Sequence, residues 1–329
     1  MRPASHINDL RSQAPEVRPS HAHRLTAPGQ APASIAQALP RRLAAVLSAG
    51  WALLGPAGFA HSCGVDTPCV VDGGAYLVRP PSSWDGRSAL PAVVFFHGWM
   101  QSARDVMRDE ALARVISDLG VLEVAPDGAG RGWSFPGSPS HYRDEFAFIR
   151  AMLDDVETRF PIDKRRLRAS GFSQGGSMVW YAACFLGDRF AAFVPIAGDF
   201  WEPPPTMCPS GPVSIRHIHG LADETFPASG RAVAEHAHQG DLWRGWAFWL
   251  RTDGCMAPPE RVEAVGEMTC QTWAARTCSS GRELTLCLHS GGHMFNAEWL
   301  REAYRWVQEL DVAGVAPPSE AATPDADAP

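Results

Sequence analysis

Residues 168–180 read RASGFSQGGSMVW and place Ser173 between Gly171 and Gly175. The residues before Ser173 have the character of a buried strand, and those after it have the character of a helix. The pattern G-x-S-x-G at such a junction is typical of a nucleophile elbow, a strained turn that leaves the serine Oγ exposed and tolerates no bulk beside it. A glycine-rich turn with a capping serine has the same composition, so the rest of the chain must distinguish the two interpretations.

Short apolar runs alternate with longer amphipathic segments on both sides of this stretch. The expected strands are residues 75–81, 92–98, 121–128, 166–173, 190–198 and 213–220, followed by an apolar strand that starts at residue 284. The expected helices are residues 105–120, 144–160, 175–187 and 297–310. This alternation predicts an α/β fold, in which helices cover both faces of a mostly parallel central sheet.

Reactive residue types follow four of these strands. They are found at His97-Gly98-Trp99, Ser173, Asp223 and His293. In open α/β sheets, functional sites form beyond the carboxyl ends of the strands. A serine hydroxyl needs a base within hydrogen-bonding distance, and the base needs a carboxylate that fixes its tautomer. We therefore expect Ser173 to be the nucleophile, His293 the base and Asp223 the carboxylate.

Other residues could fill two of these roles. His289 is an alternative base, but it falls within the last apolar strand, whereas Gly291 and Gly292 give the segment before His293 the freedom to return toward the serine. Asp199 follows the strand next to the nucleophile strand and is an alternative carboxylate. His97 could act as a second base, although we expect it to shape the turn after its strand.

An acyl-transfer site also needs hydrogen-bond donors for the oxyanion of the tetrahedral intermediate. The backbone N–H of Gln174, directly after the nucleophile, is one expected donor. The backbone N–H of Trp99 is the other, since it follows the strand that ends at His97-Gly98. No step of this chemistry requires a metal ion or an organic cofactor, and the sequence predicts neither.

The first sixty residues differ from the rest of the chain. Residues 1–40 are rich in Pro, Ala, Ser and His, and Arg41-Arg42 precede a short apolar run, with Gly58 and Ala60 at the −3 and −1 positions before His61. This pattern predicts an N-terminal extension and signal peptide over residues 1–60 and a secreted or periplasmic protein. A membrane anchor is the alternative, but the run is short and broken by Gly55-Pro56. Residues 61–312 are the expected catalytic domain, and residues 313–329 an acidic, disordered tail.

Eight cysteines support export, because all of them follow the expected cleavage point. They are Cys63, Cys69, Cys184, Cys208, Cys255, Cys270, Cys278 and Cys287. An even number in an exported chain indicates disulfides, and the alternative, a zinc site, usually has closely spaced C-x-x-C pairs that are absent here. Local closure favours Cys63 with Cys69 and then Cys184 with Cys208, and the last four are expected to pair among themselves.

The charge of the chain excludes some partners. The formal net charge is −7, and residues 1–60 contribute six Arg against Asp9 and Glu16, which leaves −11 on the remainder. Such an acidic protein has no electrostatic footprint for nucleic acid and no attraction to an anionic membrane surface. The expected partner is a small or oligomeric substrate.

The span from Cys63 to Leu310 resembles the secreted polyhydroxybutyrate depolymerase and feruloyl or acetyl-xylan esterase group of α/β-hydrolases. The similarity rests on YLVRPPSSWDG, LPAVVFFHGW, VAPDG with a later Trp133, RDEFAFIRAMLDDV, SGFSQGGSMVW, HIHGLADETFP, DGC and SGGHMF, in that order. It implies acyl transfer by Ser173, Asp223 and His293, whose order along the chain is that of α/β-hydrolases. Members of the group often carry Trp-Pro soon after the histidine, whereas Met294-Phe295-Asn296 follows here.

These observations predict a secreted serine esterase that acts through an acyl-enzyme on hydroxyalkanoate oligomers or on feruloyl or acetyl esters. A serine peptidase of the same fold is the alternative enzyme. A catalytically silent binding protein is a third hypothesis, which the presence of all three catalytic residue types disfavours. Trp201, Trp243, Trp246 and Trp249 could line an aromatic pocket, but we expect them to pack in the core.

Overall fold

Six parallel strands form the centre of the sheet. In the computed structural model, which describes residues 63–312, they lie in the order β4, β3, β5, β6, β7 and β12. Their bounds are Leu122–Pro126, Leu90–Phe96, Ile162–Phe172, Ala192–Ile196, Ile215–Gly220 and Leu284–His289. Most of their side chains are buried, as expected for parallel strands covered on both faces. The predicted N-terminal extension, signal peptide and tail lie outside the described residues.

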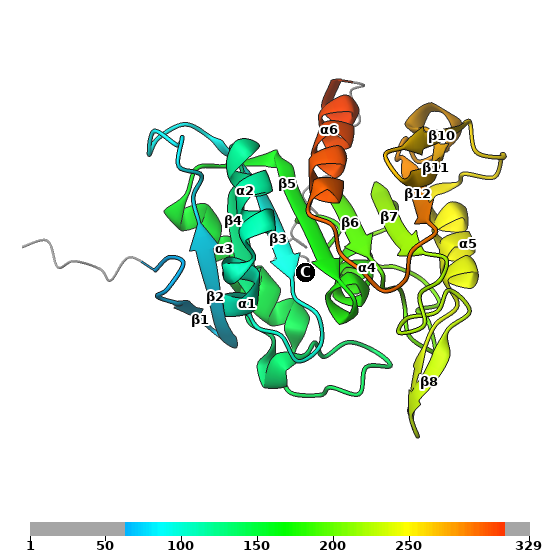
Figure 1. Ribbon diagram of the computed structural model, residues 1–329, viewed down its shortest axis with the longest axis horizontal. Helices are drawn as coiled ribbons and strands as arrows, with labels where there is room; N and C mark the ends of the chain where they lie inside the picture. The colour runs from blue at the N-terminus through cyan, green and yellow to red at the C-terminus, as the bar shows by residue number, and fades with distance from the viewer. Residues whose placement is uncertain (1–62, 313–329) are drawn as a thin grey trace, which may run out of the picture. The chain divides into compact units, whose positions relative to one another are not determined.

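Antiparallel strands extend this sheet at both edges to ten strands. β1 (Cys69–Val71) and β2 (Gly74–Arg79) join beside β4, and β11 (Met268–Trp273) and β10 (Arg261–Val265) join beside β12. A separate hairpin, β8 (Arg231–Ala234) and β9 (Ala237–Gln239), projects below the sheet in Figure 1. The sequence pattern predicted β2 but not the other edge strands. β1 has only three residues and β10 is exposed along most of its length, whereas the alternating burial along β11 was not recognised from the sequence.

The helices form one layer on each face of the sheet (Figure 1). α1 (Ala103–Arg108), α2 (Glu110–Asp118) and α6 (Glu298–Val312) contribute to one buried apolar cluster. α3 (Glu145–Arg159), α4 (Gln174–Phe185) and α5 (Leu242–Asp253) contribute to the other. The predicted α/β fold is therefore confirmed. Within residues 63–312, no helix has both the length and the apolar character needed to cross a bilayer.

One predicted helix is divided in two. The expected helix over residues 105–120 is interrupted at Asp109, whose backbone has an extended conformation with φ −71° and ψ 102°. Its carboxylate accepts hydrogen bonds from the N–H groups of Ala111 and Leu112 and so caps the start of α2. An aspartate can gain more from capping than from continuing a helix, which explains why apolar periodicity alone was misleading here.

Four disulfides cross-link the described residues. They join Cys63 to Cys69, Cys184 to Cys208, Cys255 to Cys278, and Cys270 to Cys287. Both predicted pairs are present, and the last four cysteines pair among themselves as expected. The Cys270–Cys287 bond links β11 to β12, so it ties the antiparallel edge to the strand that leads to His293.

Candidate active site

Ser173 occupies a strained turn between β5 and α4. Its φ of 59° and ψ of −123° lie outside the regions that side-chain-bearing residues usually adopt. Its N–H donates to Ile196 O at 2.9 Å, which holds the turn against β6. A Cβ atom on Gly171 would lie 2.6 Å from Gly175 O, and one on Gly175 would overlap Phe96 O. The glycines therefore permit a close approach of backbone segments, as the elbow interpretation requires.

We expect Gly175→Ala to destabilise the fold by at least about 2 kcal/mol, because the added methyl group meets backbone that cannot rotate away. The measurement is the free energy of unfolding in urea. Gly64→Ala is a matched control with nothing within 4 Å of its Cβ, and its effect should stay within about 0.5 kcal/mol. Equal stability of the two variants would contradict the tight packing of the elbow.

Three side chains from distant parts of the chain meet at the end of β5. His293 Nε2 lies 2.9 Å from Ser173 Oγ, and His293 Nδ1 lies 2.7 Å from Asp223 Oδ2. The ring of Phe172 packs against the imidazole at a centroid distance of 4.7 Å. Ser173, His293 and Asp223 therefore form one hydrogen-bonded series in the order that proton transfer from a serine requires.

Backbone donors hold the carboxylate of Asp223. Its Oδ1 accepts hydrogen bonds from Thr225 N at 2.9 Å and Phe226 N at 2.7 Å, which leaves Oδ2 for His293. Burial would raise the pKa of Asp223, but the hydrogen bonds from His293 and Phe226 N–H outweigh burial and lower it below its ordinary value. The carboxylate is therefore ionised at neutral pH and can stabilise an imidazolium.

The loop after β3 passes directly beside Ser173. A Cβ on Gly98 would lie 3.6 Å from Ser173 Cβ, so the backbone of the loop borders the nucleophile. Gln101 Oε1 accepts from Gly98 N at 2.8 Å, and Met100 N donates to Arg131 O at 2.8 Å. Between these anchored residues, Trp99 N–H donates to no acceptor within the described part of the chain. This geometry suits the oxyanion role predicted for Trp99, and Gln174 N–H at the start of α4 suits the second donor.

The alternative residues have other environments. His97 Nε2 accepts from Gly128 N at 2.9 Å and its Nδ1 bonds Gly98 O at 2.8 Å, so both ring nitrogens are engaged in shaping the turn. His289 packs on Trp299 and accepts from Gly291 N through Nδ1, so this nitrogen is already engaged within its own segment. Asp199 is 1% exposed and, among residues 63–312, no donor contacts its carboxylate. Burial raises its pKa well above the ordinary value, which disfavours the ionised form that a catalytic carboxylate needs.

Aromatic residues around the site have mixed roles. Trp201, Trp246 and Trp249 are buried, as expected for core residues, whereas Trp243 is 47% exposed. The sequence pattern did not single out the buried His217 and His219, which lie on the face of β7 that contacts Trp180 of α4. The signal was present as H-x-H within an apolar strand, since i and i+2 lie on one face of a strand.

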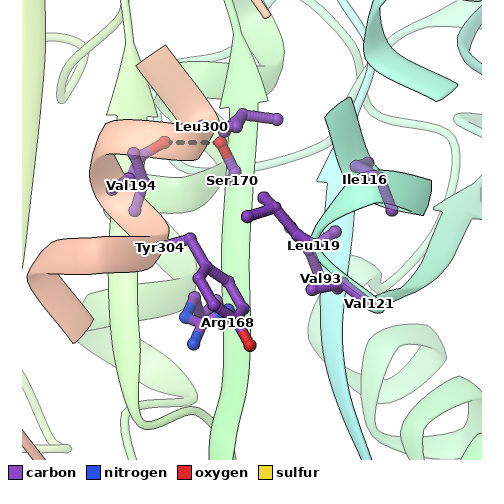
Figure 2. Close-up of a pocket in the computed structure, with 10 residues that line it drawn as sticks. Val93, Ile116, Leu119, Val121, Arg168, Ser170, Val194, Leu300 and Tyr304 are labelled. Carbon is purple, nitrogen blue, oxygen red and sulfur yellow. Dashed lines mark hydrogen bonds between the residues drawn. The ribbon is translucent and has the colours of Figure 1, made fainter. Parts of the chain in front are cut away.

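A separate small cavity lies on the α2 and α6 face of the sheet (Figure 2). The centre of a water-sized sphere can move within about 20 Å³ of this cavity, which is room for roughly one water molecule. Arg168 stacks on Tyr304 there, and Ser170 Oγ donates to Val194 O at 2.8 Å. The cavity contains no acid–base pair near a nucleophile, so it is not a second candidate active site.

Within residues 63–312, no group of three or more His, Cys, Asp and Glu is placed to hold a metal ion.

Comparisons with known proteins agree with this architecture. The model of the α/β hydrolase fold family matches residues 91–253. "Probable feruloyl esterase C" from Aspergillus flavus is 31% identical over 225 residues, which are 66% of this chain and 75% of that protein. Feruloyl esterase B from Piromyces equi is 26% identical over 229 residues, which are 66% of this chain and 42% of that protein. The chain spans about half the length of three curated relatives that it matches, with 45, 42 and 58% covered.

A solved structure shares the fold at low sequence identity. Acetyl xylan esterase from Aspergillus awamori superposes with a TM-score of 0.51 and 14% identity, over 74% of this chain and 95% of that one. The sheet order, the elbow at Ser173 and the similarity to the Aspergillus flavus protein lead to the same assignment. The chain belongs to the α/β-hydrolase family, in the group that includes the feruloyl esterases.

Proposed function

We propose that this protein is a serine carboxylic-ester hydrolase that acts through an acyl-enzyme. The observation that carries the proposal is the hydrogen-bonded series from Ser173 Oγ through His293 to Asp223, with the serine held in a strained elbow. Serine, imidazole and ionised carboxylate in this arrangement supply a nucleophile, a base and an anion that stabilises the charged base.

In the first half-reaction, Ser173 Oγ attacks the ester carbonyl while His293 Nε2 takes the hydroxyl proton. The N–H groups of Trp99 and Gln174 bind the oxyanion of the tetrahedral intermediate. Asp223 stabilises the imidazolium through the 2.7 Å hydrogen bond to Nδ1. When the intermediate collapses, the imidazolium returns its proton to the departing alkoxide, and the alcohol leaves.

In the second half-reaction, water attacks the acyl-enzyme carbonyl and His293 accepts a proton from that water. The same two N–H groups bind the second oxyanion. Collapse breaks the bond between the acyl carbon and Ser173 Oγ, and His293 returns the proton to the serine. The products are one carboxylic acid and one alcohol for each water consumed, and the protein ends in its starting state.

The substrate we favour is an ester with a hydrophobic acyl group. Trp99 lies in the loop that carries one expected oxyanion donor, and its side chain is 65% exposed. Met294 directly follows His293, and its side chain is 39% exposed. Exposed apolar side chains at these two chain positions favour an acyl group that can pack against them. The two relatives described above both carry the name feruloyl esterase, which supports feruloyl esters ahead of acetyl esters and hydroxyalkanoate oligomers.

We further propose that the protein functions outside the cytoplasm. The four disulfides in residues 63–312 fit an oxidising compartment, and the relatives named feruloyl esterase fit a role in hydrolysing external esters. The division into a signal segment over residues 1–60, a catalytic domain over 61–312 and a tail over 313–329 belongs to the same proposal.

The test compares esters with amides on the same preparation. We expect hydrolysis of p-nitrophenyl acyl esters and methyl ferulate, weaker hydrolysis of acetylated xylan and hydroxybutyrate oligomers, and no cleavage of dipeptide anilides. A fluorophosphonate should add to the tryptic peptide that contains Ser173, as measured by mass spectrometry. Anilide cleavage with inert esters would identify a peptidase, and the absence of both activities and of the adduct would identify a silent binding protein.

A further inference from the structure

A continuous series of buried hydrogen bonds connects α4 to the segment that holds Asp223. Trp180 Nε1 on α4 donates to His217 Nδ1 at 3.1 Å. His217 Nε2 lies 3.2 Å from His219 Nδ1, and His219 Nε2 lies 2.8 Å from Phe226 O. The four residues are at most 1% exposed, so water does not compete for these hydrogen bonds.

The chemistry of the two ends fixes the direction of the series. An indole N–H can only donate, so His217 Nδ1 must accept and His217 Nε2 must carry the proton. His219 Nδ1 therefore accepts in turn, and His219 Nε2 donates to the carbonyl of Phe226, which can only accept. Burial lowers the pKa of both histidines, which keeps the two rings neutral. Each ring thus has one defined tautomer.

The end of the series coincides with the anchor of Asp223. Phe226 accepts from His219 through its carbonyl and donates through its own N–H to Asp223 Oδ1 at 2.7 Å. The next residue is Pro227, whose ring restricts the backbone on the other side of that carbonyl. His219 does not bind the carboxylate itself, because its Nε2 lies 4.0 Å from Asp223 Oδ2. The hydrogen-bonded connection from His219 to Asp223 therefore runs through Phe226.

We propose that the Trp180–His217–His219 series is a positioning device that holds Phe226, and through it the Asp223 carboxylate, in the geometry that His293 needs. The proposal rests on the catalytic role proposed above for Asp223. An apolar strand would fill this part of the core without the need to satisfy four buried polar atoms, so stability alone does not explain two histidines here. Because Trp180 belongs to the helix that begins after Ser173, the series also links the nucleophile helix to the segment that carries the carboxylate.

The main test replaces His219. His219→Leu removes the donor to Phe226 O at similar volume, and we expect kcat for p-nitrophenyl butyrate to fall about 10- to 100-fold with KM changed less than about threefold. His219→Gln retains an amide N–H near the position of Nε2, so it should recover most of the lost kcat. A role in packing alone would make these two variants equally active, and such a result would overturn the proposal.

A matched tryptophan pair tests the other end of the series. Trp180→Phe and Trp246→Phe both shorten a buried ring near His217, but only Trp180 donates to it. Trp246 Nε1 has no acceptor within the described residues. We expect Trp180→Phe to lower kcat about three- to tenfold and Trp246→Phe to change it less than twofold. Equal effects of the two variants on kcat would overturn the proposal. The tryptophan pair tests the proposal even if His219→Leu fails to fold.

Two further measurements separate this proposal from the proposed function. The ¹⁵N shifts of the imidazole rings should show unprotonated Nδ1 and protonated Nε2 in both His217 and His219, and the opposite tautomers would contradict the series. If Asp223→Asn abolishes ester hydrolysis while a folded His219→Leu variant keeps full kcat, only the positioning role fails. If Asp223→Asn itself remains fully active, the catalytic role proposed for Asp223 fails, and the positioning role fails with it although the protein is an ester hydrolase.

Discussion

Ester hydrolysis by the Ser173→Ala variant is expected to fall by about 10⁴- to 10⁶-fold in kcat, with KM changed less than about threefold. The variant retains the oxyanion donors and the substrate surface but lacks the oxygen that forms the acyl-enzyme. Its residual rate should resemble that of water attacking a bound ester. The measurement is the initial rate with p-nitrophenyl butyrate, together with the loss of the fluorophosphonate adduct.

Ser170→Ala provides the control for this variant. Ser170 lies on β5, three residues before the nucleophile, and its buried hydroxyl donates to Val194 O. Its removal should cost about 1 kcal/mol of stability and change kcat less than twofold. Substantial ester hydrolysis by Ser173→Ala, or equal losses in both variants, would contradict the assignment of Ser173 as nucleophile.

Much of the site could be predicted from sequence because its chemistry follows the ends of strands. Ser173, Asp223 and His293 each follow an apolar run, and a parallel sheet brings such ends to one edge. The structure brings the three side chains within hydrogen-bonding distance, while their catalytic roles stay predictions. The choice of His293 over His289 rested on Gly291 and Gly292, whose freedom lets the segment turn back after β12.

Features that depend on tertiary contacts were not accessible in the same way. The break at Asp109 exists because a side chain caps a new helix, a choice that apolar periodicity does not encode. β10 is largely exposed and joins the sheet only through pairing with β11, so its sequence lacks a strong pattern. The partners of His217 and His219 come from α4 and from the segment after β7, which only the folded chain brings together.

The second large effect is expected for Asp223→Asn, which should lower kcat about 10⁴-fold. Thr225 N–H and Phe226 N–H both point at Oδ1, so the asparagine must keep its oxygen there. Its NH₂ group then faces His293 Nδ1, which has to accept instead of donate. The proton of the imidazole moves to Nε2, opposite Ser173 Oγ, and the ring can no longer take the serine proton.

The stability of this variant should depend on pH in a defined direction. Burial acts to raise the pKa of Asp223, yet the hydrogen bonds from His293 and Phe226 N–H bring it below the ordinary 3.8. A lowered folded-state pKa contributes stability that is present above the unfolded-state pKa and is lost as the pH falls through the folded-state value. The difference in unfolding free energy between wild type and Asp223→Asn should therefore be largest near neutral pH and shrink below about pH 4.

Asp199→Asn is the matched control for this experiment, because Asp199 was the alternative carboxylate. Its side chain is buried and burial raises its pKa well above the ordinary value, so an amide of the same shape resembles the protonated acid that burial favours. We expect kcat to change less than about threefold, against the 10⁴-fold loss for Asp223→Asn. The opposite result, an inactive Asp199 variant and an active Asp223 variant, would mean that the carboxylate serving His293 during catalysis comes from the strand next to the nucleophile, after a rearrangement of the segment that carries His293.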